Sequence, residues 1–92
     1  MTNDERLKLF QMATTRMDSL LIQYPAYLPF VSIQNQLGYL ISLVTGQNQK
    51  REGLAKINIG FITMREVEAR DDKIADLLYS VSSEVDKMKE GN

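Results

Sequence analysis

The acidic cluster Glu66-x-Glu68-x-x-Asp71-Asp72 is the part of this sequence whose side chains are best placed to do chemistry. Paired carboxylates can act as general acid and base, or bind a cation through their oxygens. A carboxylate-dependent enzyme using Glu66 with Asp71 or Asp72 is therefore one interpretation. The cluster lacks the Asp-x-Asp-x-Asp-Gly order of a calcium loop, so its spacing predicts no metal site.

Other catalytic chemistries lack the residues that they need. The chain contains neither cysteine nor histidine, which removes thiolate nucleophiles, thiolate zinc sites and the side chain best suited to proton transfer near neutral pH. Its glycines are too widely spaced for a phosphate-binding loop, and none is followed by Gly-Lys-Ser/Thr. We therefore expect no enzyme, no cofactor and no bound metal.

The charge pattern argues against nucleic acid and membrane partners. The formal net charge is -1 and the basic residues are scattered, so no field neutralises a run of phosphates and no basic recognition helix is present. Acidic residues precede the first apolar run, unlike in a secretory signal, and a cytoplasmic location is expected. The uncharged stretch from Ser19 to Gln49 contains two prolines and several amides, which makes it too polar for a membrane span.

Apolar residues recur at intervals of three and four along most of the chain. Thr2 and Glu5 form a predicted capping box for a helix over about 3–23, and Tyr24 to Pro29 form a connector. A second helix fills the uncharged stretch and ends at Thr45-Gly46. The predicted apolar stripes are Phe10, Ala13, Met17, Leu20 and Tyr24 for the first helix, and Phe30, Ile33, Leu37, Leu40, Ile41 and Val44 for the second.

Two further helices complete the predicted fold. The third carries Leu54, Ile57, Phe61 and Met64, although its glycines and β-branched residues allow part of it to be irregular. The fourth starts at Asp71-Asp72 and carries Ile74, Leu77, Leu78, Val81, Val85 and Met88. Gly38 and Gly60 are interpreted as close helix contacts. The sequence thus predicts one all-α domain over 1–92, a small antiparallel bundle of about four helices.

Two features of these helices have both a structural and a functional interpretation. Glu66 and Glu68 fall in the last turns of the third helix, where the helix dipole disfavours negative charge. They either lie on a solvated face neutralised by Arg65 and Arg70 or meet a basic partner. The second helix lacks charge on its outer face, so it is either central in the bundle or reserves one face for a partner.

An ordered set of motifs runs through this region: Tyr24-Pro25-x-Tyr27, Ser32, Gln36-Leu37-x-Tyr39, Arg51, Leu54, Gly60, Arg65-Glu66 and Glu68-x-x-Asp71. From about Leu20 to Leu78 the chain resembles the cytoplasmic immunity proteins of bacterial type VI secretion systems that neutralise an effector hydrolysing NAD and NADP. The resemblance implies a helical antitoxin that binds a cognate effector toxin, covers its active site and catalyses no reaction.

On this resemblance, the candidate toxin-binding residues are those of the acidic cluster and three polar residues of the matching motifs. They are Glu66, Glu68, Asp71, Asp72, Tyr27, Gln36 and Tyr39. A toxin that accepts an anionic dinucleotide is expected to present positive charge to the acidic residues. The alternative is a helical adaptor or structural protein without a toxin partner, which self-associates through the uncharged face of the second helix.

Overall fold

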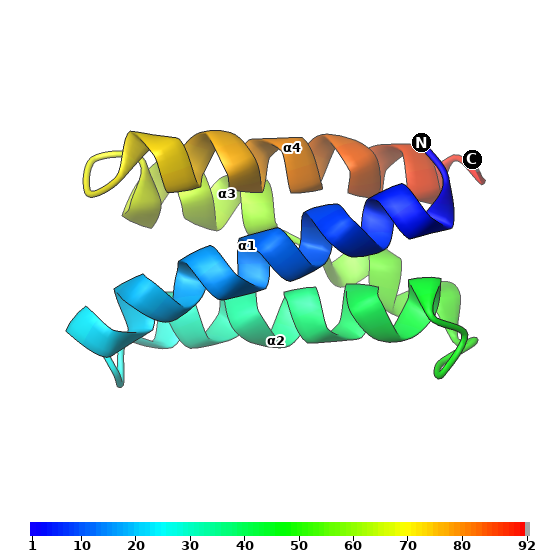
Figure 1. Cartoon of the computed structure of the whole chain (residues 1–92), viewed down its shortest axis with the longest axis horizontal. Helices are drawn as coiled ribbons and strands as arrows, with labels where there is room; N and C mark the ends of the chain where they lie inside the picture. Colours follow the sequence, from blue (N-terminus) through cyan, green and yellow to red (C-terminus); the bar gives the residue numbers. More distant parts are fainter. Residues whose placement is uncertain (92) are drawn as a thin grey trace.

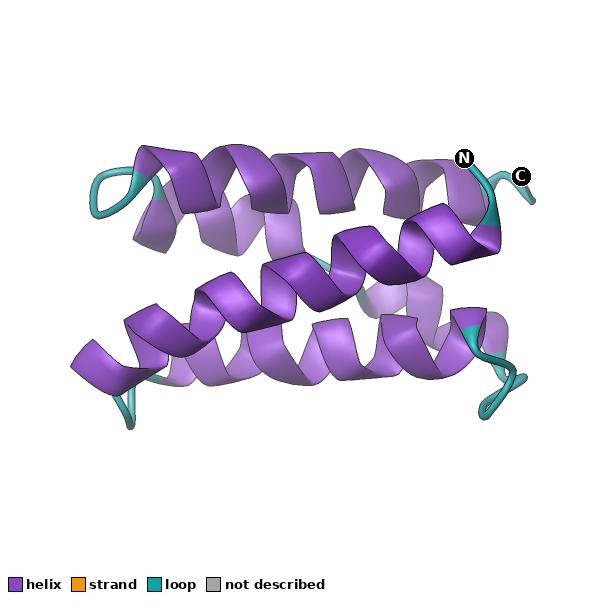
Figure 2. Cartoon of the chain, viewed as in Figure 1, coloured by secondary structure: helices purple, strands orange, loops and turns teal. Residues whose placement is uncertain are grey.

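The computed structural model describes residues 1–91 and consists, over that range, of helices joined by turns, without a strand (Figure 2). This confirms the predicted all-α fold. The elements are α1 (Asn3–Gln23), α2 (Leu28–Val44), the 3-10 helix η1 (Arg51–Lys56), α3 (Ile59–Ile62), the π-helix η2 (Thr63–Val67) and α4 (Asp72–Lys89).

The first helix begins and ends where the sequence predicts. The capping box is formed: the Thr2 hydroxyl oxygen accepts from the Glu5 amide at 3.2 Å, and the Glu5 carboxylate accepts from the Thr2 amide at 2.9 Å. These hydrogen bonds to Thr2 lower the pKa of Glu5 because they stabilise its ionised form. Tyr24 was expected on the buried stripe, but it lies beyond the last turn and is 39% exposed.

The second helix starts before Pro29, so the connector is shorter than predicted. Proline is tolerated in the first turn, where its missing N–H would have no partner within the helix. The predicted end at Thr45-Gly46 is confirmed, and Gly46 has the positive φ of 82° that favours glycine.

The third predicted helix is wrong in part, both in its continuity and in the face it buries. A break at Ile57 and Asn58 separates η1 from α3, and Phe61 and Met64 are 54% and 57% exposed. The buried face is instead made by Ile59, Thr63 and Val67. Successive four-residue steps drift around an α-helix, and the wider π turn offsets that drift, so these residues stay aligned on the core.

The glycine of α3 sets the distance to α4, whose N-cap is Asp71. A Cβ added to Gly60 would lie 2.6 Å from the Ser82 hydroxyl oxygen, which confirms the predicted close contact. Gly38 does not make such a contact, because a Cβ there would meet no atom within 4 Å. The Asp71 carboxylate accepts from the Ile74 amide at 2.9 Å and begins α4 as predicted.

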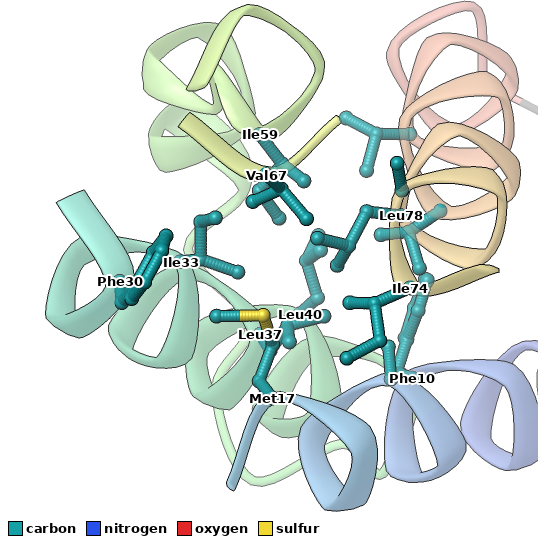
Figure 3. Packing of buried hydrophobic residues seen from close by; sticks show 14 of the residues in the cluster. Phe10, Met17, Phe30, Ile33, Leu37, Leu40, Ile59, Val67, Ile74 and Leu78 are labelled. Atoms are coloured by element: carbon teal, nitrogen blue, oxygen red, sulfur yellow. The ribbon is translucent and has the colours of Figure 1, made fainter. Parts of the chain in front are cut away.

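The helices run alternately up and down around one core (Figure 1). α1 packs against α2 and α4 on one side, while α3 bridges α2 and α4 on the other. Both chain ends lie at one end of the bundle, and the α1–α2 and η2–α4 connectors lie at the other. Side chains from α1, α2, α3 and α4 meet in the core of the bundle (Figure 3). Among them are Phe10, Met17, Phe30, Ile33, Leu37, Leu40, Ile59 and Leu78.

A buried ion pair joins α1 to α4 at the end of the bundle that carries the termini. Arg6 Nε donates to Glu84 Oε1 at 2.8 Å, and the residues are only 7% and 2% exposed. Arg6 also donates to Asn3 Oδ1 at 3.3 Å. The pair was not anticipated, although Glu84 interrupts the apolar face of α4, and such an interruption is a signal that a charged partner lies opposite.

Candidate functional site

Tyr27 and Glu66 meet at the end of the bundle opposite the termini. The Tyr27 hydroxyl donates to Glu66 Oε1 across 39 residues of sequence, linking the α1–α2 connector to η2. This hydrogen bond raises the pKa of Tyr27, and burial and the negative charge of Glu66 add to the effect. The structure thus brings together two of the predicted site residues from different elements.

Arg70 lies near the same carboxylate oxygen of Glu66 that accepts from Tyr27. Its Nη1 atom lies 3.7 Å from Glu66 Oε1 and donates to the Glu66 carbonyl oxygen at 2.6 Å. The guanidinium carbon also lies 5.3 Å from the ring centroids of Tyr24 and Tyr27 and 5.6 Å from that of Phe30. Cation–π attraction therefore keeps Arg70 beside Glu66, and the dipole penalty expected for Glu66 is offset within the chain.

The remaining acids of the cluster differ in how far they are engaged. Glu68 accepts from the Tyr79 hydroxyl, which raises the pKa of Tyr79, and Asp71 caps α4. Asp72 is exposed in the first turn of α4 and has no side-chain partner within residues 1–91. We call residues 66–72 the acidic junction. Its free negative charge is concentrated at Glu68 and Asp72, whereas Glu66 and Asp71 mainly hold the structure together.

Arg65 does not neutralise the acidic junction as the sequence suggested. Its guanidinium carbon lies 5.5 Å from the centre of the Phe61 ring instead. Arg70 takes the role expected for both arginines because the α3–η2 segment turns it toward Glu66 and the three aromatic rings.

Gln36 and Tyr39 lie along α2, in contact with the η1–α3 segment rather than with the acidic junction. Gln36 Nε2 donates to Asn58 Oδ1 at 2.7 Å, and the Asn58 amide donates to Gln36 Oε1 at 2.9 Å. The Tyr39 hydroxyl donates to the Lys50 carbonyl oxygen at 2.6 Å, and its ring packs so closely on Gly53 that an added Cβ would lie 2.6 Å away. Both side chains therefore hold the η1–α3 segment against α2.

A groove separates α2 from the η1–α3–η2 segment. One hollow of about 480 Å³ is lined by Leu28, Val31, Ser32, Asn35, Gln36, Tyr39, Gly53, Lys56 and Ile57. A second, of about 440 Å³, is lined by Leu28, Pro29, Ser32, Phe61, Ile62, Arg65 and Glu66. Because the hollows share Leu28 and Ser32, we treat them as one surface, the α2–α3 groove. Its rim residues Leu28 and Phe61 were not among the predicted site residues, because the helical period placed Phe61 in the core and Leu28 lay in the predicted connector.

The outer face of α2 is partly covered and partly free. Gln34 donates to the Thr14 carbonyl oxygen at 3.2 Å and to Asp18 Oδ1 at 2.8 Å, so it faces α1. Asn35 is exposed in the groove. One side of the uncharged helix is therefore covered by α1, and the side that carries Asn35 is open to solvent.

Neither metal ligation nor membrane insertion has a recognisable basis in the described part of the chain. Within residues 1–91, no group of three or more acidic side chains is arranged to hold a metal ion. Over the same residues, no helix combines the length and the apolar character that crossing a bilayer requires.

Comparison with known proteins identifies a matching family. A family model described as Tsi6 matches residues 5–87. Neither the curated proteins nor the solved structures gave a significant match.

Proposed function

Because this chain belongs to the Tsi6 family of type VI secretion immunity proteins, we propose that it binds an NAD(P)+-hydrolysing effector toxin and covers the toxin's active site. Tsi6 itself neutralises an NAD(P)+ glycohydrolase. The proposed role is that of a cytoplasmic antitoxin acting by protein–protein contact, without a reaction or cofactor of its own.

The extent of the family match carries the proposal. It runs from the first turns of α1 to the last turns of α4, so it covers the whole bundle and every candidate binding residue. A match confined to one helix would support only a shared packing motif. Here the matched region includes the acidic junction together with the elements that position it.

The charge and rigidity of the acidic junction support contact with a basic surface. Glu68 and Asp72 present carboxylates at the end of the bundle, while the Tyr27, Arg70 and Tyr79 contacts hold the backbone around them. An active site that accepts an anionic dinucleotide is expected to be positively charged. A preorganised acidic surface then loses little entropy on binding, and complementary charge speeds association.

The other candidate residues have distinct roles in this proposal. Tyr27 and Tyr39 already donate their hydroxyl hydrogens within the chain, so they would offer ring surface to the toxin. Gln36 already pairs with Asn58, and Glu66 and Asp71 would position the backbone that carries Glu68 and Asp72.

The test is NAD+ hydrolysis by the effector domain encoded beside this gene, titrated with the purified protein. We expect activity to disappear at a 1:1 ratio. Undiminished hydrolysis at a large molar excess would overturn the proposal.

A pair of charge-matched variants tests the acidic junction separately. The Glu68→Gln/Asp72→Asn variant should associate about tenfold more slowly at low salt, with the difference shrinking as salt rises. Asp86→Asn/Glu90→Gln removes the same charge at the opposite end of α4 and should associate like the wild type. Equal rates for both variants would exclude the acidic junction from the interface.

A further inference from the structure

The α2–α3 groove exposes large apolar side chains that the fold itself does not cover. Leu28 is 77% exposed on one rim and Phe61 is 54% exposed on the other. The hollow that both residues line also contains Pro29, Ser32 and Ile62, together with the charged Arg65 and Glu66. Large exposed apolar side chains around a hollow are typical of the centre of a protein interface.

The groove has a cation at each end. Lys56 lines one hollow and Arg65 the other, and within residues 1–91 no carboxylate lies within ion-pairing distance of either. The acid that lines the groove, Glu66, is already engaged by Tyr27 and Arg70. The groove therefore combines an apolar centre with two positive charges that have no carboxylate partner in this part of the chain.

The π turn is what places these groups on the surface. With Ile59, Thr63 and Val67 aligned on the core, Phe61 and Arg65 fall on the opposite side, four residues apart and stacked on each other. In this turn the Thr63 carbonyl oxygen accepts from the Glu68 amide at 3.0 Å, five residues along the chain. π turns of this kind occur frequently at functional sites.

We infer that the α2–α3 groove binds a segment of the effector that inserts a bulky apolar side chain between Leu28 and Phe61 and places carboxylates against Lys56 and Arg65. This inference rests on the proposed function, because the occupant is the effector. The charge pattern selects against a basic segment, which both cations would repel.

The groove also determines how the effector would lie. It adjoins the acidic junction at Glu66, so a positive groove and a negative bundle end form one continuous surface of two signs. An effector that offers acids to the groove and bases to the acidic junction fits in one orientation only. Such complementarity contributes register and selectivity more than it contributes affinity.

The experiment measures the affinity of the purified effector domain for groove variants by isothermal titration calorimetry. Leu28→Ala/Phe61→Ala should bind at least about 30-fold more weakly, the loss typical of truncated hot-spot side chains. Met64→Ala is the matched control: Met64 is 57% exposed on the same segment but lines neither hollow, and it should bind within about twofold of the wild type.

Charge reversal tests the chemistry of the occupant. Arg65→Glu should weaken binding, and reversing an acidic residue of the effector segment that the complex protects from hydrogen exchange should restore it. Restoration is the double-mutant signature of a direct pair. If Arg65→Glu binds as well as the wild type, the occupant does not pair carboxylates with this end of the groove.

The outcomes separate the two proposals. Inhibition by the wild type together with wild-type affinity of Leu28→Ala/Phe61→Ala would overturn the groove and leave the proposed function standing. Failure of the wild type to bind the effector would overturn both. If sedimentation shows that the chain alone dimerises and that the groove variant abolishes the dimer, the occupant is a second copy and the inference is wrong.

Discussion

The two ends of the bundle each carry an arginine–glutamate pair, and the pairs differ in almost every other respect. Arg6 and Glu84 join α1 to α4 with side chains only 9% and 3% exposed, whereas the side chains of Arg70 and Glu66 are 35% and 23% exposed. The two side chains of the first pair are buried between the helices, and the exposed Lys87 Nζ also lies 3.7 Å from Glu84 Oε2. The second is shared with Tyr27 and the aromatic rings, and it lies beside free carboxylates.

Burial decides what each pair can do. Removing one member of a sealed pair leaves a charge that water cannot reach, so such a pair mainly fixes the geometry of the fold. A half-exposed pair loses little when a partner or solvent replaces one contact. The Arg6–Glu84 pair therefore mainly stabilises the fold, whereas the Arg70–Glu66 pair is accessible from outside the bundle.

The largest expected effect comes from opening the sealed pair. Glu84→Ala removes the carboxylate that accepts from Arg6 Nε at 2.8 Å inside the bundle and should lower the free energy of unfolding by about 3–5 kcal/mol in urea denaturation. Asp86→Ala removes an exposed acid from the same helix and should stay within about 0.5 kcal/mol of the wild type.

The sealed pair has a second test. Replacing both members in Arg6→Met/Glu84→Met should recover most of the lost stability, since no unpaired charge remains buried. A loss below about 1 kcal/mol in Glu84→Ala would mean that water reaches the pair and that the two ends do not differ as described.

A smaller effect is expected at the acidic junction from the cap of α4. Asp71→Ala removes the acceptor for the Ile74 amide and should cost about 1 kcal/mol. Asp76→Ala, an exposed change inside the same helix, should be close to neutral in the same denaturation series. If Asp71→Ala had the same free energy of unfolding as Asp76→Ala, the cap would add nothing to the rigidity of the acidic junction.

The smallest expected effect is a dependence of folding stability on pH that only the acidic junction contributes. The pKa of Tyr27 is raised above its ordinary value of 10.0 by the hydrogen bond to Glu66, so the folded state holds this proton more tightly than the unfolded state. The resulting stability is complete below about pH 10 and is lost as pH rises through the folded pKa.

Melting temperatures measured across the alkaline range check this expectation. Tyr27→Phe should flatten part of the alkaline decline, and Tyr27→Phe/Tyr79→Phe more of it, because the pKa of Tyr79 is raised in the same way by Glu68. The Arg6→Met/Glu84→Met variant should keep the wild-type dependence. An unchanged decline in the double tyrosine variant would show that these hydroxyls do not couple to folding.

Local signals were sufficient for the long helices. The capping box at Thr2 and Glu5, the glycine at 46 and the cap at Asp71 each act within a few residues, and all three end or begin helices where predicted. The buried stripes of α1, α2 and α4 also follow one helical period, except that Tyr24 is 39% exposed and Ile41, Val44 and Leu77 are only partly buried.

The segment from 51 to 67 could not be predicted in the same way. Its breaks depend on partners from other elements: Asn58 bonds to Gln36 of α2, and Gly60 lies against Ser82 of α4. These contacts select a 3-10 turn, a short α-helix and a π turn over the single helix that periodicity favoured. Exposure of Phe61 and Met64 is the result.

The sequence by itself determined the fold class and the position of the acidic cluster, because helical period, caps and neighbouring acids are set within a few residues of chain. Only the tertiary structure decided which charges stay free. Tyr27 contacts Glu66, Tyr79 contacts Glu68 and Arg6 contacts Glu84, across 39, 11 and 78 residues of sequence. Whether a side chain is buried, paired or available depends on what the other helices place beside it, which no local pattern specifies.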